Sequence, residues 1–189
     1  MSRRQGFGSL LHLMVRFAGS LQPVGPRAAS ERWALGQLEP GERSLFQSMS
    51  GPDRRHGIGV ARRALDLTRA SGMAPEALPD GFVAAALLHD VGKVDSRLGT
   101  FSRAWTTLVA LALGRQRVLS WEGSTCSGPD RLACRMARYL RHDRIGAELI
   151  SEAGGATLAS KWAREHHLPE ELWSVDRRLG RCLKDADGD

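Results

Sequence analysis

Histidine and aspartate residues at helical spacing are the side chains of this sequence best suited to chemistry. His56, His89 and His166 each have small or apolar residues at steps of three and four, so each should point inward from its helix. Asp90 follows His89 directly and places a carboxylate beside an inward imidazole. One inward histidine alone is more often a core residue than a ligand, whereas several with a carboxylate favour a metal site.

The ligand types indicate which metals such a site would take. Imidazole and carboxylate bind borderline and hard divalent cations, and helical bundles hold metals with side chains from separate helices. We therefore predict one or two divalent ions, with Mn, Fe, Ni, Co, Zn or Mg as candidates. The 3 cysteines form no Cys-x-x-Cys pair, which argues against a structural thiolate zinc site. Their odd number predicts reduced thiols in a cytoplasmic protein.

The elements that must position these side chains are predicted to be helices. Residues 50–53 (Ser-Gly-Pro-Asp) are typical of a helix start, and the helix should run to about residue 72. Proline or glycine residues also precede further segments that have apolar residues at helical spacing. These segments are residues 82–89, 132–140, 158–166 and 172–183. Gly92 is a plausible helix stop. No stretch alternates with a period of two, so we predict an all-α fold.

The N-terminal part of the chain is set apart by its composition. Residues 3–16 predict a basic amphipathic helix, and residues 20–31 form a connector rich in Pro, Gly and Ser. No apolar stretch approaches the roughly 20 residues that would cross a bilayer, so we predict no transmembrane segment. We divide the chain into an N-terminal helical extension, residues 1–49, and one compact helical domain, residues 50–189.

Several segments carry a family resemblance. Asp-Arg-Arg-His-Gly-Ile-Gly-Val-Ala at residues 53–61 and Leu-Leu-His-Asp-Val-Gly-Lys at residues 87–93 resemble the leading motifs of the HD superfamily of metal-dependent phosphohydrolases. The segment His-x-x-x-Gly-Ala-Glu from His142 and the pair His166-His167 are similar to those of its HDIG and HD-GYP branches. The family's closing aspartate is matched by Asp187, with Asp185 as the alternative.

The resemblance, which covers roughly residues 50–187, implies a compact helical HD-domain bundle and a set of site residues. It implies a core metal site formed by His56, His89, Asp90 and Asp187. It implies that His142, His166 and His167 complete a second site, with Asp90 bridging the two ions. Asp90 and Lys93 would be the catalytic residues, with Lys93 touching substrate phosphate; the alternative for Lys93 is an ordinary surface lysine.

The resemblance further implies a metal-dependent phosphohydrolase or phosphodiesterase acting on a nucleotide-like or other small phosphate ester. No Gly-Tyr-Pro signature follows His167, so hydrolysis of cyclic di-GMP is not supported. The alternative is a non-catalytic HD module that binds metal or nucleotide as a regulator or scaffold. The net charge of +6 favours an anionic partner, but the chain offers no stacking platform or recognition helix for nucleic acid. The sequence does not predict the oligomeric state.

Overall fold

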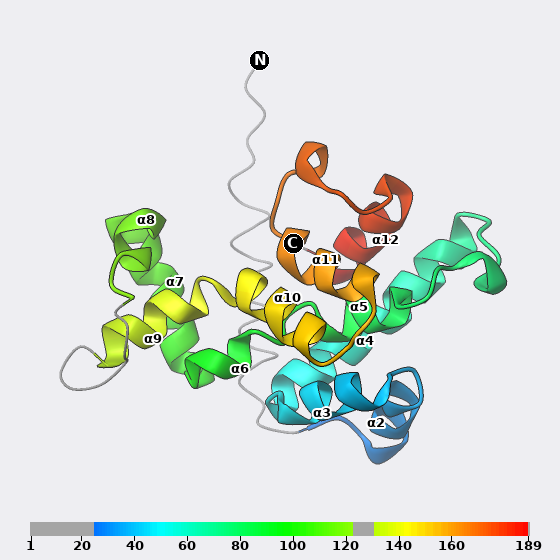
Figure 1. Cartoon of the computed structure of the whole chain (residues 1–189), viewed down its shortest axis with the longest axis horizontal. Helices are drawn as coiled ribbons and strands as arrows, with labels where there is room; N and C mark the ends of the chain where they lie inside the picture. The colour runs from blue at the N-terminus through cyan, green and yellow to red at the C-terminus, as the bar shows by residue number, and fades with distance from the viewer. Residues whose placement is uncertain (1–24, 123–130, 189) are drawn as a thin grey trace.

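Residues 25–122 and 131–188 are described by a computed structural model of the protein (Figure 1). Across these residues the chain forms helices and no strand, so the predicted all-α fold is confirmed. The elements are α2 (Ala28–Leu35), α3 (Pro40–Ser48), α4 (Gly51–Ala70), η1 (Pro75–Ala77), α5 (Phe82–Leu88), α6 (Lys93–Ser96), α7 (Thr100–Leu113), α8 (Arg115–Leu119), α9 (Arg131–Tyr139), α10 (His142–Glu152), α11 (Thr157–Glu165), η3 (Glu170–Leu172) and α12 (Arg177–Asp187). The amphipathic helix predicted at residues 3–16 lies outside the described residues.

A main bundle forms the larger part of the structure. Helix α5 packs against α4 and α11, while α12 packs on α4 and α10 packs on α11. Its core includes the fully buried side chains of Phe82, Leu88 and Trp162. Helices α2 and α3 join the same core through Ala34 and Phe46. The division of the chain at residue 49 stays a prediction, but residues 28–48 are packed into the bundle.

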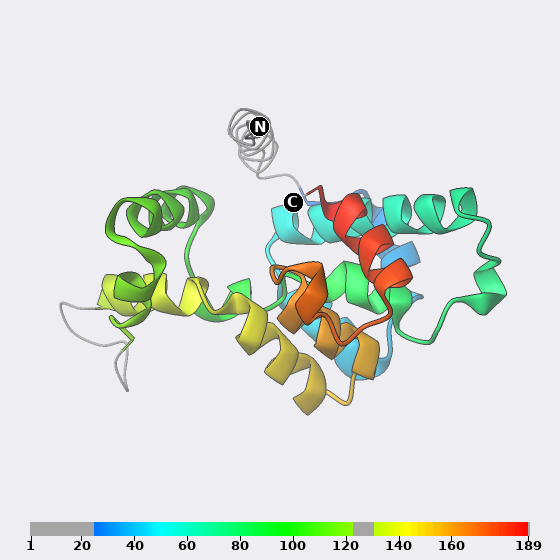
Figure 2. The same cartoon turned by 90° about the horizontal axis from the view of Figure 1, so that it is seen from above.

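A second, smaller core lies among α7, α8 and α9. It consists of Leu98, Val118, Met136 and Leu140. Figures 1 and 2 both show these three helices to one side of the main bundle, with α6 and the start of α10 leading to it. Among the described residues, we find no helix with the length and apolar character needed to cross a membrane.

Helix α4 begins where the sequence predicts. The hydroxyl oxygen of Ser50 accepts a hydrogen bond from the backbone N–H of Asp53, which satisfies one of the donors that a helix start leaves unpaired. Further along, Gly57 lets α4 approach α5 closely, since a Cβ there would lie 2.6 Å from the backbone oxygen of Leu87. This approach brings His56 against the end of α5.

The prediction of one helix over residues 172–183 is wrong. The chain forms the short turn η3 and then an extended segment, and α12 begins only at Arg177. Asp176 caps α12, because its carboxylate accepts from the N–H groups of Arg178 and Leu179. The preceding segment is held instead by the buried carboxylate of Glu165, which accepts from the N–H of Ser174 at 2.7 Å.

The prediction that the cysteines are reduced thiols is wrong at one position. Cys182 is a free, buried thiol, but Cys134 is disulfide-bonded. Spacing along the sequence does not show which thiols the fold brings within bonding distance, so this bond had no sequence signal.

Candidate metal centre

Three histidines occupy the ends of helices in the same way. His89 ends α5, His166 ends α11, and His142 stands three residues after the end of α9. The last-turn carbonyls of a helix have no partner within the helix, so a side-chain N–H that follows can pair with one. In each histidine the Nδ1 atom lies 2.8–2.9 Å from the backbone oxygen three residues earlier, in Ala86, Ala163 and Tyr139 respectively.

These contacts set which ring nitrogen carries the proton. A carbonyl oxygen only accepts hydrogen bonds, so Nδ1 must be protonated in His89, His142 and His166. In the neutral ring this leaves a lone pair on Nε2. Histidine ligands of metals are usually oriented in this way, with one ring nitrogen donating a hydrogen bond and the other facing the metal.

The Nε2 atoms of these three histidines converge on the carboxylate of Asp90. His89 Nε2 lies 3.4 Å from Asp90 Oδ2, while the Nε2 atoms of His142 and His166 lie 3.4 and 3.9 Å from Asp90 Oδ1. The Nε2 atoms of His89 and His166 are buried and have no hydrogen-bond partner among the residues that the structure describes. Buried polar atoms normally find a partner, so two such nitrogens beside a carboxylate indicate a place for a cation.

One group of potential ligands lies toward α4 and α12. The ligand atoms of His56, His89 and Asp90 all fall within 4.8 Å of one another. Asp187 adds its carboxylate to this group, with Oδ1 at 2.9 Å from His56 Nε2 and 3.7 Å from His89 Nε2. Asp187 is buried, whereas Asp185 is exposed. Of the two aspartates considered from the sequence, the fold therefore brings Asp187 to the cluster.

A second group lies toward α10 and the end of α11. The ligand atoms of His142, His166 and His167 also fall within 4.8 Å of one another. His167 is exposed at the surface, and its Nε2 lies 3.1 Å from His142 Nε2. Asp90 stands between the two groups, because Oδ2 is toward His89 and Oδ1 is toward His142 and His166. All seven predicted ligands are thus placed in one cluster of two groups.

The electrostatics keep these side chains in the forms that bind cations. Burial lowers the pKa of His56, and burial followed by the neighbouring histidines holds the pKa of His166 well below its usual value. Desolvation, then His142, lowers the pKa of His167 to about 3. Burial acts to raise the pKa of Asp90, but Lys93 and His89 outweigh it and hold that pKa well below its ordinary range. At neutral pH the imidazoles of His56, His166 and His167 are therefore neutral and the carboxylate of Asp90 is ionised, as metal binding requires.

Lys93 contacts the cluster directly. It is the first residue of α6, and its ammonium group donates a hydrogen bond to Asp90 Oδ2. Burial acts to lower the pKa of Lys93, but the charge of Asp90 raises it overall, so the side chain is cationic. The half-buried position of Lys93 at the cluster does not fit the alternative of an ordinary surface lysine.

Two supporting contacts were not predicted from the sequence, although Asp53 and Gly92 both lie within the motifs at residues 53–61 and 87–93. Arg103 of α7 places Nη1 at 2.8 and 2.7 Å from the two carboxylate oxygens of Asp53, one turn before His56, and so ties the smaller core to α4. Gly92 lies so close to α10 that a Cβ would stand 2.0 Å from the backbone oxygen of His142. From the sequence, Gly92 is a plausible helix stop and part of the motif at residues 87–93, and in the structure this glycine also lets α10 approach the site closely.

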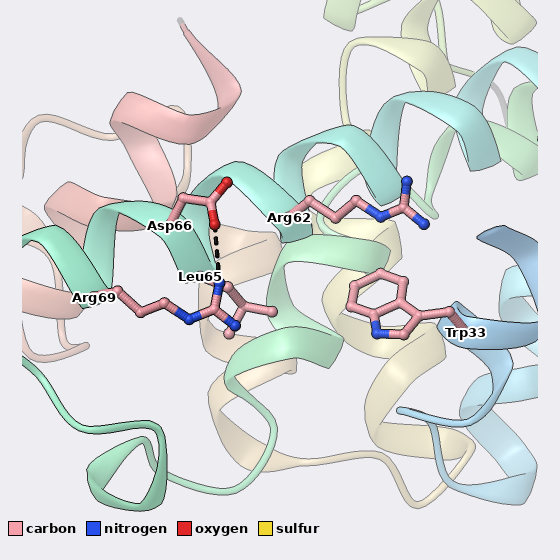
Figure 3. Close-up of a pocket in the computed structure, with 5 residues that line it drawn as sticks. All are labelled: Trp33, Arg62, Leu65, Asp66 and Arg69. Atoms are coloured by element: carbon pink, nitrogen blue, oxygen red, sulfur yellow. Dashed lines mark hydrogen bonds and ion pairs between the residues drawn. The ribbon is translucent and has the colours of Figure 1, made fainter.

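A pocket between α2 and α4 is separate from this cluster (Figure 3). Its lining consists of Trp33, Arg62, Leu65, Asp66 and Arg69. Arg62 stands over the ring of Trp33, 5.2 Å from its centroid, and Asp66 pairs with Arg69 at 2.9 Å. These polar side chains are engaged with neighbouring groups, and none belongs to the His/Asp cluster.

The geometry therefore defines one candidate centre, built from the ends of α5, α11 and α12, the start of α10 and one side chain of α4. No protein-family model matches the chain, and neither a curated protein nor a solved structure matches it significantly. The likeness to the HD superfamily thus stays a prediction that rests on the motifs of the sequence.

Proposed function

We propose that this protein is a metal-dependent phosphohydrolase or phosphodiesterase of the HD type, acting on a nucleotide-like or other small phosphate ester. The observation that carries the proposal is the position of the Asp90 carboxylate between two groups of imidazoles. Two buried Nε2 atoms there lack a hydrogen-bond partner among the described residues. Two cations sharing one carboxylate are a common arrangement in enzymes that act on phosphate esters.

The donor set fits divalent cations. His56, His89, Asp90 and Asp187 would hold one ion, and Asp90 with the three remaining histidines would hold the other. Nitrogen and oxygen ligands suit Mn, Fe, Ni, Co, Zn or Mg. When bound, such ions supply Lewis acidity toward a phosphoryl oxygen and toward a water molecule.

The chain's own side chains orient the reacting groups. The three hydrogen bonds from Nδ1 atoms to helix-end carbonyls fix the rings of His89, His142 and His166. Lys93 holds an ammonium group at Asp90, from which it can also meet an anionic phosphate oxygen. The net charge of +6 draws anionic substrates toward the molecule.

The experiment that tests this function is hydrolysis by the full chain loaded with Mn, Ni or Mg. We would assay mono- and dinucleotides and a chromogenic phosphodiester, with Asp90→Ala as the inactive control and Asp185→Ala as a matched exposed aspartate. We expect turnover that is lost in Asp90→Ala and kept in Asp185→Ala. A metal-loaded wild-type protein that hydrolyses none of these esters would contradict the proposal and favour a regulatory module.

A further inference from the structure

Helix α7 carries apolar side chains on two faces. Its inward face packs Val109 and Ala110 against the smaller core. Its outward face presents Trp105, Leu108 and Leu111, whose exposed fractions are 61%, 58% and 74%. The outward face of a surface helix is ordinarily polar. We call Trp105, Leu108 and Leu111 the apolar stripe.

The apolar stripe is continuous along the helix. Residues three apart differ by about 60° in direction around a helix with about 100° per residue, so the three side chains span about 120°. Leu113, at the end of α7, adds a further exposed leucine. Contiguous exposed apolar surface of this kind marks a site of interaction with another surface. Figures 1 and 2 show α7 in the part of the molecule that lies beside the main bundle.

The charged residues of the segment that carries the apolar stripe are all basic, although Arg103 pairs with Asp53 and Arg115 lies 3.9 Å from Asp143. Residues 97–121 contain four arginines and no aspartate or glutamate. Arg115 and Arg117 follow α7 directly and are exposed. A second copy of the chain on this face would bring arginines against arginines, which costs energy. An anionic surface with an apolar interior would satisfy both the arginines and the apolar stripe.

We propose that the apolar stripe docks on an anionic lipid bilayer. Helix α7 lies parallel to the membrane plane, with Leu108 and Leu111 entering the acyl boundary and Trp105 at the level of the headgroups. Arg115 and Arg117 contact lipid phosphates. This contact is peripheral and is independent of the function proposed for the metal centre.

Co-sedimentation of the full chain with lipid vesicles tests this docking. The vesicles contain phosphatidylcholine alone or mixed with anionic phosphatidylglycerol. The triple variant Trp105→Ser, Leu108→Ser, Leu111→Ser removes the apolar stripe, and Leu172→Ser, at a leucine with 63% exposure on the main bundle, is the matched control. We expect wild type and control to bind the anionic vesicles, and the triple variant to bind about tenfold more weakly or less.

Two further measurements keep the test decisive. Helix content and metal content should be the same in all variants, because the substituted side chains are exposed.

If the triple variant misfolds, the variant Arg117→Gln takes its place. This variant should weaken binding to anionic vesicles only, and added salt should do the same. Wild type that does not bind anionic vesicles, or a folded triple variant that binds like wild type, would overturn the proposal. A wild-type dimer that the triple variant converts to monomer, without lipid binding, would overturn it too.

Discussion

The two carboxylate oxygens of Asp90 are directed to different groups of imidazoles. This asymmetry arises because His89 approaches Oδ2, while His142 and His166 approach Oδ1. A single buried carboxylate with imidazole rings on both sides is well suited to share two cations and poorly suited to an ordinary core. At the scale of residues, the site therefore depends on a few side chains that can be substituted one at a time.

Asp187 and Asp185 form a natural pair for such a change. Asp187→Ala removes an oxygen that lies 2.9 Å from His56 Nε2, whereas Asp185→Ala alters only an exposed side chain two residues earlier. We expect Asp187→Ala to lower metal affinity by at least about tenfold and Asp185→Ala to leave it unchanged. Titration of metal into chelator-stripped protein measures both. Equal affinities in the two variants would remove Asp187 from the ligand set.

Lys93 allows binding of metal to be separated from turnover. We expect Lys93→Gln to keep metal bound but to reduce turnover on the order of 100-fold, because a cation near the reacting phosphate is lost. Lys161→Gln, at an exposed lysine of α11, is the matched control and should be fully active. The check is the rate of phosphodiester hydrolysis alongside metal content. Normal turnover in Lys93→Gln would show that Lys93 does not act on the substrate phosphate and only pairs with Asp90.

At the scale of elements, the site exists because five helices meet at their ends or at close approaches. His89 and His166 stand where α5 and α11 end and His142 stands where α10 begins, so a small shift of one of these helices would move a candidate ligand. Two glycines permit close approaches of the helices at the site, Gly57 between α4 and α5 and Gly92 between the end of α5 and α10. Packing at these points should control the geometry of the metal centre.

Gly92→Ala tests this control. Its Cβ would stand 2.0 Å from the backbone oxygen of His142, so α10 must move. We expect the free energy of unfolding to fall by about 1–3 kcal/mol and metal affinity to fall with it. Gly99→Ala is the control, since nothing lies within 4 Å of a Cβ there. Urea unfolding measures the stability, and metal titration measures the affinity. A Gly92→Ala protein that is as stable as Gly99→Ala would contradict a tight contact between Gly92 and α10.

At the scale of the whole molecule, the cluster places several titratable groups inside a small protein. In the metal-free chain the burial of neutral imidazoles must be supported by the rest of the fold. Bound metal should then stabilise the folded state, because the unfolded chain has no assembled site. Stability is therefore expected to respond to pH and to chelators together.

The pH dependence has a definite sign. The pKa values of His56, His166 and His167 are lowered in the folded protein, that of His167 to about 3. Below about pH 6.5 the unfolded chain takes up protons that the folded chain does not, and each such proton changes the free energy by about 1.4 kcal/mol per pH unit. We expect the stability of chelator-treated protein, measured by urea unfolding, to fall as pH drops from 6.5 toward 3. His167→Gln should show a shallower fall; a stability that rises on acidification would contradict the assignment of neutral rings.

The sequence predicts the local parts of this structure better than the distant contacts. Helical spacing places His56, His89 and His166 on inward faces, and the start of α4 follows from its cap at Ser50. The apolar spacing over residues 172–183 is misleading, because Asp176 caps α12 and Glu165 holds the preceding residues in an extended segment through Ser174. The pairing of Arg103 with Asp53, fifty positions apart, depends on how the two cores meet and has no local signal.

Metal content per chain tests the candidate centre most directly. The full-length protein would be loaded with Mn, freed of excess metal and analysed by inductively coupled plasma mass spectrometry. The cluster around Asp90 predicts stoichiometric metal in wild type and in Asp185→Ala, and strong depletion in both His89→Ala and Asp90→Ala. Metal content that is the same in all four proteins would show that these residues do not form a metal centre.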